Sequence, residues 1–212
     1  MYFTIRRGID TCIAFIALIV LSPLFLLLSI AIKCDSKGPV FFKQERIGKD
    51  FKSYQMIKFR SMVVNAQNIG TGVYSFANDP RVTKVGRFLR KTSLDELPQL
   101  WNIIKGDMSF VGPRSPVVGH FPAKESLNED YKRRFTVLPG ITGLAQVTGR
   151  NEMTWDEKVR YDNLYIDKVK RYTIFYDIQI WFLTIARVFS MKNVEESQEV
   201  MKQNQESENW KQ

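Results

Sequence analysis

Histidine and cysteine are scarce in this chain, which has one histidine, His120, and two cysteines, Cys12 and Cys34, among 212 residues. Neither cysteine has a second cysteine or a histidine at metal-ligand spacing, which argues against a zinc site. A single histidine also argues against a serine–histidine or cysteine–histidine nucleophile. The sequence has no Walker-type phosphate loop and no GxGxxG dinucleotide motif. Carboxylates and basic side chains therefore remain as the candidate chemical groups.

Acidic residues are outnumbered, with 22 Asp and Glu against 31 Lys and Arg and a formal net charge of +9. A basic protein favours anionic partners, such as nucleic acid, an anionic membrane surface or a phosphorylated small molecule. The sequence contains no lysine-rich run and no recognisable nucleic-acid motif, so we expect no nucleic-acid partner.

Residues 12–32, CIAFIALIVLSPLFLLLSIAI, form an uncharged apolar run. The run matches the roughly 20 residues that a bilayer crossing needs and is too long for a typical signal-peptide core. Ser22 and Pro23 lie in its middle, where proline removes a backbone hydrogen bond and kinks a helix. Both flanks are basic, whereas a crossing helix usually carries its positive charge on the cytoplasmic side. We therefore expect a re-entrant helix that bends at Ser22–Pro23, with a kinked ordinary crossing as the alternative.

The remaining sequence predicts an α+β fold that is mostly helical, in one catalytic domain over 37–191 that follows the membrane segment 1–36 and precedes a polar tail, 192–212. Alternating apolar and charged residues with turn signals predict a β-hairpin, and Gly/Pro-rich stretches predict loops. The expected elements are a hairpin within 38–62, a loop over 65–80, a basic helix after Arg81, a helix ended by Gly106, loops at 109–116 and 138–151, a helix over 152–169 and an amphipathic helix over 176–189. The last helix carries Ile178, Trp181, Phe182, Ile185 and Phe189 on one face, which suits a membrane interface as well as a core.

Two adjacent acids, Asp95 and Glu96, follow a basic cluster in KVGRFLRKTSLDELPQLWN. They suit a helix start, either as a Ser93–Glu96 capping box or with Asp95 as the N-cap. Near a helix N-terminus the Asp95 carboxylate is expected to be ionised, and it can then bind Mg²⁺ or attack phosphorus as a nucleophile.

Basic side chains near these acids are candidate phosphate ligands. Lys58 and Arg60 flank Phe59 and would share one face of a strand. Arg87 lies on the basic helix, and Arg114 and Arg150 lie in loops beside proline or glycine. Several fixed cations are what a diphosphate substrate requires.

Three strings, IKFRSM, TSLDELPQLWNIIKGDMSFVGPR and PGITGLAQVTGRN, resemble the bacterial sugar transferase family in identity and order. This family contains small monotopic phosphoglycosyl transferases, and the resemblance runs from Arg6 to about Phe189. The resemblance implies transfer of a sugar 1-phosphate from a UDP-sugar to polyprenyl phosphate with release of UMP. The reaction would be the first membrane step in assembling a capsule, O-antigen, exopolysaccharide or glycoprotein.

The same resemblance implies roles for individual residues. Asp95 would form a covalent phosphosugar intermediate and bind Mg²⁺, and Glu96 would assist it. Gln146 would join the basic side chains in binding substrate. The catalytic domain would lie on the cytoplasmic face of the bacterial inner membrane, in a minimal form of the family. A homodimer would be a further partner arrangement.

One departure is Ser115, which follows Pro113 and Arg114 where the family usually has a second proline. The change is expected to loosen the Arg114 loop. Two other functions stay open from the residues alone. One is a membrane-tethered basic binding module, and the other is a glycosyltransferase that releases UDP.

Overall fold

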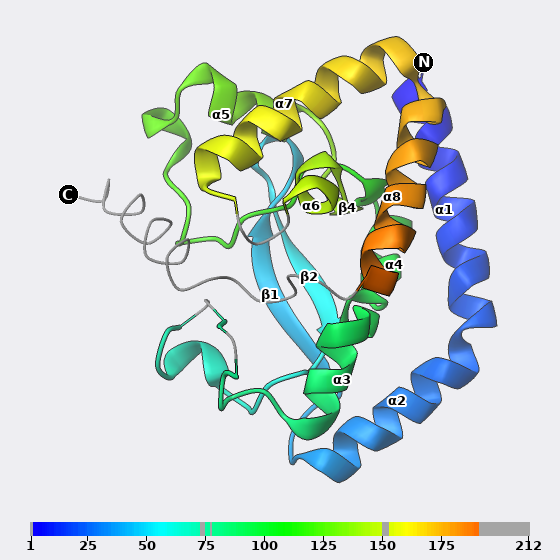
Figure 1. Cartoon of the computed structure of the whole chain (residues 1–212), viewed down its shortest axis with the longest axis vertical. Coiled ribbons are helices and arrows are strands. Elements are labelled where there is room, and N and C mark those ends of the chain that lie inside the picture. Colours follow the sequence, from blue (N-terminus) through cyan, green and yellow to red (C-terminus); the bar gives the residue numbers. More distant parts are fainter. Residues whose placement is uncertain (1, 73–74, 77, 150–152, 191–212) are drawn as a thin grey trace.

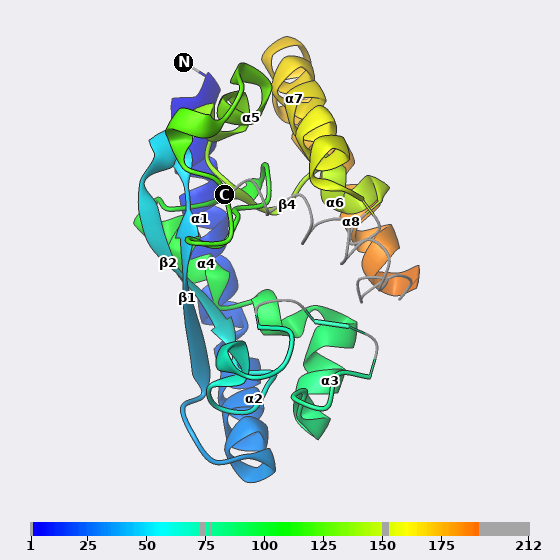
Figure 2. The ribbon, with the colours of Figure 1, turned by 90° about the vertical axis from the view of Figure 1, so that its left-hand side faces the viewer.

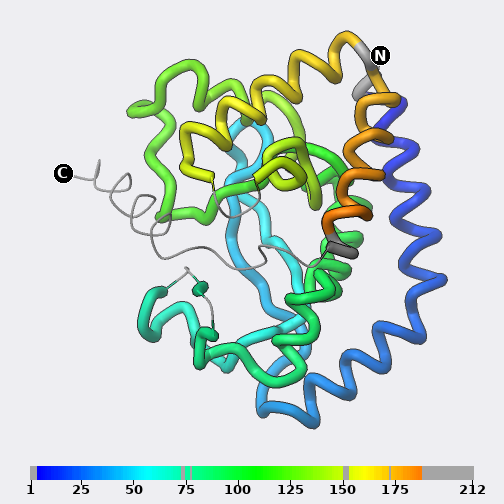
Figure 3. Tube along the Cα trace, viewed as in Figure 1, coloured from blue at the N-terminus to red at the C-terminus, as the bar shows by residue number. Residues whose placement is uncertain are grey.

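The structure is a computed structural model, and it describes residues 2–72, 75–76, 78–149 and 153–190. It confirms an α+β fold dominated by helices (Figures 1 and 3). The helices are α1 (Tyr2–Val20), α2 (Ser22–Asp35), α3 (Lys84–Thr92), α4 (Gln99–Lys105), α5 (Glu129–Arg133), α6 (Leu144–Thr148), α7 (Trp155–Tyr172) and α8 (Ile174–Ser190). The strands are β1 (Phe41–Ile47), β2 (Ser53–Phe59), β3 (Ser109–Val111) and β4 (Gly140–Thr142). Arg150 and the tail 192–212 lie outside the described residues, and the three-part domain division stays a prediction.

The apolar run breaks at the dipeptide where the sequence predicts it. Helices α1 and α2 meet at a 62° bend and trace one edge of the molecule (Figure 3). Pro23 lies in the first turn of α2, and the Ser22 hydroxyl donates to the Ile19 carbonyl over 2.7 Å. Among the described residues, no single helix has the length and apolarity of a membrane span, and only the bent pair taken together meets that criterion.

The hairpin is confirmed as an antiparallel pair, with Phe41 opposite Phe59 and Ile47 opposite Ser53. Helix α1 packs against α4, and Ala14 is fully buried among hairpin and α4 side chains. Gly106 ends α4, as predicted, with a φ of 98° that suits glycine. The α1 side chain of Arg7 donates to the carbonyl of Ile103 over 2.8 Å at this helix end. The N-terminal helix is therefore part of the same core as the hairpin.

The two Gly/Pro-rich segments predicted as loops contain short regular elements, so this prediction is wrong in part. Strands β3 and β4 pair in parallel, and α6 follows β4 directly. The strands approach so closely that a Cβ on Gly140 would lie 2.1 Å from the Gly112 nitrogen. Glycine is here because of close backbone packing, which sequence reading takes for a turn signal.

A buried polar cluster joins α1 to β3, α7 and α8. Arg6 pairs with Asp177 at 3.0 Å and donates to the Tyr165 hydroxyl at 2.9 Å and to Ser109 Oγ at 2.6 Å. The Ser109 hydroxyl in turn donates to Asp10. Because buried charges require partners, this cluster fixes α1 against the C-terminal helices.

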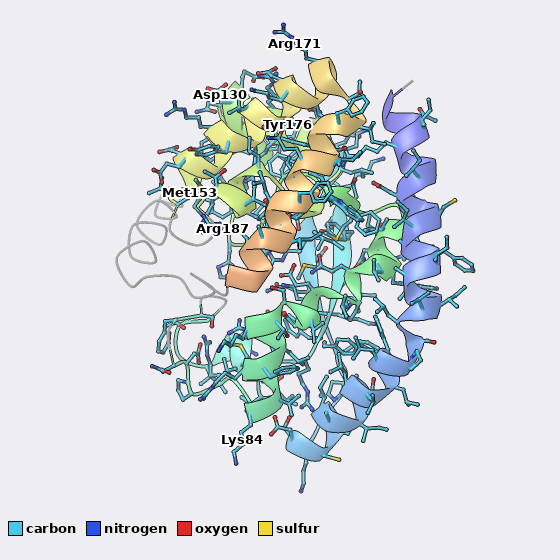
Figure 4. All side chains as sticks on the ribbon, turned by 45° about the vertical axis from the view of Figure 1, so that its right-hand side comes forward. Lys84, Asp130, Met153, Arg171, Tyr176 and Arg187 are labelled. Atoms are coloured by element: carbon cyan, nitrogen blue, oxygen red, sulfur yellow. The ribbon has the colours of Figure 1, made fainter. Side chains whose placement is uncertain are left out.

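Large apolar side chains project outward from α1, α2 and α8. Phe175 and Phe182 on α8 are 75% and 70% exposed. Figure 4 shows side chains along the outer sides of α1 and α2 with no other element of the chain over them. The predicted apolar stripe of α8 is largely exposed, with Ile178, Trp181 and Ile185 all outside the core. Large exposed apolar surfaces are typical of interaction sites.

Candidate active site

Asp95 and Glu96 line a cavity of about 690 Å³. Its wall is formed by the hairpin, the 61–75 loop, the end of α3, the Arg114 loop, and parts of α6, α7 and α8. Figure 2 shows the hairpin on one side and α3, α6 and α8 on the other. Segments distant in sequence therefore meet around the two acids.

The acids occupy a short 3₁₀ turn, Leu94–Glu96, and not the start of an α-helix. Ser93 adopts a left-handed conformation with φ of 59°, and its side chain makes no capping hydrogen bond to the turn. Helix α4 begins later, with Pro98 as its N-cap. Both predicted capping arrangements are therefore wrong, because the acids lie in a separate 3₁₀ turn that ends before α4 begins.

Glu96 is held by two cations. Lys58 Nζ donates to Glu96 Oε1 over 2.7 Å, and Arg114 Nη2 donates to the same oxygen over 3.2 Å. Although burial opposes ionisation, these two positive charges hold the pKa of Glu96 far below its usual value. Glu96 is therefore an ionised group that orients Lys58 and Arg114.

Asp95 has a different environment from Glu96. It is 8% exposed, and no described residue donates a hydrogen bond to its carboxylate. Burial raises the pKa of Asp95 and the negative charge of Glu96 adds to this, against the opposing positive charge of Lys58. A carboxylate that is desolvated yet not hydrogen-bonded keeps its lone pairs available for a metal or an electrophile. The two neighbouring acids thus have distinct protonation behaviour.

Lys58 and Arg60 do not share one task. Lys58 faces Glu96 in the cavity, where burial lowers its pKa and Glu96 partly restores it. Arg60 also borders the cavity, but its guanidinium donates to the carbonyls of Ser36 and Lys37 at the end of α2. Arg60 therefore links the end of α2 to β2, and its expected phosphate role stays a prediction.

The basic helix α3 presents a different arginine from the one expected. Arg87 is exposed and lies outside the described cavity lining. Arg90 lines the cavity, and its Nη1 donates to Ser75 Oγ over 2.6 Å. Sequence spacing shows that positions 87 and 90 are neighbours on a helix, but which one faces a ligand depends on how α3 packs.

Arg46 is a further cavity residue, and no sequence motif singled it out. Its Nη1 donates to the Ser115 carbonyl over 2.7 Å, and its Nε donates to Gln44 Oε1. Burial, helped by the charge of Arg114, lowers the pKa of Arg46 to about 10. The alternation of β1 could have placed it on the same face as Gln44.

The far end of the cavity is formed by α6 and α7. Gln146 lines it, and both polar atoms of its side-chain amide are buried with no hydrogen-bond partner among the described residues. Nearby, Arg134 pairs with Asp162 at 2.8 Å, and both side chains are only 2% exposed. Burial raises the pKa of Asp162 to about 6. Of the predicted ligands, the cavity thus brings together Lys58, Arg60, Arg114 and Gln146 with the two acids.

A sequence model described as bacterial sugar transferase matches residues 1–191. This chain belongs to the bacterial sugar transferase family. It is 44% identical over 193 residues to the UDP-glucose:undecaprenyl-phosphate glucose-1-phosphate transferase of Klebsiella pneumoniae, covering 89% of this chain and 41% of that protein. It is 40% identical over 194 residues to the undecaprenyl-phosphate galactose phosphotransferase of Salmonella typhimurium, covering 85% of this chain and 39% of that protein. The chain thus spans about two fifths of the length of the curated relatives it matches.

Membership of this family makes Mg²⁺ an expected cofactor. The oxygen atoms of Asp95 and Glu96 are therefore candidate metal ligands. The described residues contain no group of three or more His, Cys, Asp or Glu side chains able to hold a metal. Mg²⁺ in phosphoryl-transfer sites commonly uses one or two carboxylates together with substrate phosphates and water. Asp95 has unengaged oxygens on the cavity, whereas Glu96 is occupied by Lys58 and Arg114. The residues fit an ion held jointly by Asp95 and a bound diphosphate.

Proposed function

We propose that this chain transfers a sugar 1-phosphate from a UDP-sugar to polyprenyl phosphate and releases UMP. The observation that carries the proposal is the pairing of a buried, unengaged Asp95 with the Glu96–Lys58–Arg114 cluster on one cavity wall. The names of the relatives, which specify undecaprenyl-phosphate sugar phosphotransferases, support the same reaction class.

The charge and size of the cavity suit a nucleotide diphosphate sugar. Among the described residues, nine Lys or Arg and three Asp or Glu side chains line it. A diphosphate needs such an excess of fixed cations, because charge develops on the oxygens of the transferred phosphoryl group. The volume of the cavity lies within the range of roughly 300–1,000 Å³ that is typical of small-molecule sites.

The proposed reaction has two displacements. An Asp95 oxygen attacks the phosphorus that bears the sugar, and the bridging P–O bond breaks so that the oxygen leaves with UMP. A polyprenyl phosphate oxygen then attacks the same phosphorus and releases the Asp95 carboxylate, which gives the lipid-linked sugar diphosphate.

Glu96 acts in this scheme through its neighbours. Its carboxylate holds Lys58 and Arg114 beside Asp95, where their charges stabilise the phosphoryl oxygens. Bound Mg²⁺ would add neutralisation of the phosphate charge.

Membrane attachment is also part of the proposal. The bend at Ser22–Pro23 and the exposed apolar side chains of α1, α2 and α8 support a re-entrant helix with the active site on the cytoplasmic face of the bacterial inner membrane. Single cysteines at Tyr2 and Ser36, in a chain lacking Cys12 and Cys34, should both resist an impermeant thiol reagent in intact cells. Labelling of the Tyr2 position alone would show a spanning helix.

The nucleotide product tests the reaction. Detergent-solubilised protein is incubated with polyprenyl phosphate, Mg²⁺ and UDP-glucose or UDP-galactose, and the released nucleotide is identified. We expect UMP. Release of UDP would indicate a glycosyltransferase, and no release from any of a wider panel of UDP-sugars would favour a binding module. The product would serve as the first lipid-linked unit of a surface glycan or glycoprotein.

A further inference from the structure

The segment that carries Arg114 is restrained at every backbone carbonyl. Four successive oxygens, from Pro113 to Pro116, each accept a hydrogen bond. The donors are Gly140 N to Pro113 O (3.0 Å), Arg134 Nη2 to Arg114 O (2.8 Å), Arg46 Nη1 to Ser115 O (2.7 Å) and Ile47 N to Pro116 O (3.0 Å). Ser115 also precedes a proline, which limits its own backbone to extended conformations. These bonds restrain the backbone of the loop, although Ser115 lacks a proline ring.

Ser115 has a side-chain anchor as well. Its hydroxyl lies 2.7 Å from the Tyr54 hydroxyl, and the two residues are 6% and 9% exposed. Tyr54 is directly opposite Arg46 in the hairpin, so the two side chains lie on one face. One cross-strand pair thus holds both the carbonyl and the hydroxyl of Ser115.

The contacts of Ser115 affect the neighbouring Arg114, whose side chain reaches the acids. Its side chain is 45% exposed and reaches Glu96 over 3.2 Å. A long, exposed side chain loses several rotatable bonds of freedom when it is held in one place. Where its guanidinium lies then depends strongly on the backbone from which it starts.

We propose that Ser115 and Tyr54 are positioning residues for Arg114. The hydroxyl pair replaces the restraint of a proline ring and sets the distance from the Arg114 guanidinium to Glu96 and to the substrate phosphate. Neither hydroxyl is required to touch the substrate. This inference rests on the proposed function, because its readout is UMP release.

A purely structural role for the hydroxyl pair makes a different prediction from a positioning role. Removal of one hydroxyl leaves the other buried and unpaired, which destabilises the fold, whereas removal of both leaves none unpaired. If the role is purely structural, the double variant should regain both activity and stability. If the hydroxyl pair positions Arg114, the double variant should regain stability but not activity.

The test compares Ser115→Ala, Tyr54→Phe and the double variant, with Ser126→Ala as a matched control at an exposed hydroxyl outside the cavity. Melting temperature and kcat/KM for UMP release from UDP-sugar are measured for each. We expect kcat/KM about tenfold lower in each single variant and in the double, since one hydrogen bond is lost in every case. The melting temperature should fall in the singles and recover in the double, and Ser126→Ala should match the wild type in kcat/KM.

An Arg114→Lys background shows whether the effect passes through Arg114. In that background we expect Ser115→Ala to change kcat/KM by less than about twofold, because coupled residues are not additive. The inference would be overturned by a full tenfold loss in the Arg114→Lys background or by recovered activity in the double variant. It would also be overturned if the wild type were active and the variants equally active. If the wild type itself released no UMP from any UDP-sugar, the proposed function would fail first.

Discussion

In the proposed reaction Asp95 attacks and Glu96 orients its neighbours, and replacing Glu96 with Gln tests these two roles separately. The side chain keeps its size, but the negative charge between Lys58 and Arg114 is lost. In the wild type both cations bond one Glu96 oxygen, at 2.7 and 3.2 Å. We expect a fold that is retained and a transfer rate that falls moderately, because Asp95 stays in place.

The size of this loss follows from the two hydrogen bonds. A hydrogen bond to a charged group contributes about 1.5–3 kcal/mol and a neutral one about 0.5–1.5 kcal/mol, so each bond weakens by about 1 kcal/mol. The Lys58 side chain is only 13% exposed, so its bond should weaken by nearly this full amount. The Arg114 side chain is 45% exposed, so solvent screening makes the loss smaller there. The sum is about 1.5–2 kcal/mol, which corresponds to a rate roughly 10–30 times lower.

The pH profile gives a second, signed expectation. In the proposed reaction Asp95 attacks in its ionised form, so activity should be present above its pKa and lost as the pH falls through that pKa. Burial raises the pKa of Asp95, and the negative charge of Glu96 raises it further. The acid limb of the wild-type profile should therefore lie above that of an ordinary aspartate, and Glu96→Gln should move it to lower pH.

Steady-state UMP release measured across pH checks both expectations for Glu96→Gln, with Asp162→Asn as a control for a buried acid on the same cavity that makes no contact with Glu96. An acid limb that moves to higher pH would refute the electrostatic reasoning. So would a rate loss as complete as that of Asp95→Asn, because Glu96 would then do more than orient its two cations.

Five further substitutions test three more predictions. Lys58→Gln should raise the KM for UDP-sugar, whereas Arg60→Gln should lower the melting temperature and leave KM unchanged, because Arg60 bonds the end of α2; equal effects of the two on KM would contradict this assignment. Arg90→Ala should lower kcat/KM about tenfold and Arg87→Ala should leave it within about twofold, since only Arg90 lines the cavity; the reverse order in UMP-release assays would be incompatible with this orientation of α3. Pro23→Ala should favour a straight helix, because a proline inside a helix costs about 3 kcal/mol; loss of thiol protection at the N-terminal position would show it, and unchanged protection with normal transfer would mean that the bend has another cause.

Local patterns in the sequence predicted the elements whose causes are local. Ser22–Pro23 marks the bend because proline cannot continue the hydrogen-bond ladder, and the alternation within 38–62 marks the hairpin. Gly106 marks the end of α4 because its positive φ suits glycine.

Other features of the fold and the site could not be predicted from sequence patterns. The 3₁₀ turn at Asp95 depends on the left-handed Ser93, and the β3–β4 pair depends on the approach of Gly112 to Gly140. Arg6 reads as a basic flank of an apolar run, yet it is buried because Asp177, far along the chain, supplies its counter-charge. Residue types identified the dyad and Arg114, but only the folded chain shows which other arginines turn toward them.

We propose that Asp95 carries the sugar phosphate covalently between the two displacements, and mass spectrometry can detect this adduct. Protein is incubated with Mg²⁺ and a UDP-sugar that it turns over, without polyprenyl phosphate, then quenched in acid and mapped by peptide. We expect a sugar-phosphate adduct on Asp95 that disappears when polyprenyl phosphate is added. Asp95→Asn should form no adduct and lose nearly all turnover. An adduct on another residue, or substantial UMP release by Asp95→Asn, would contradict it.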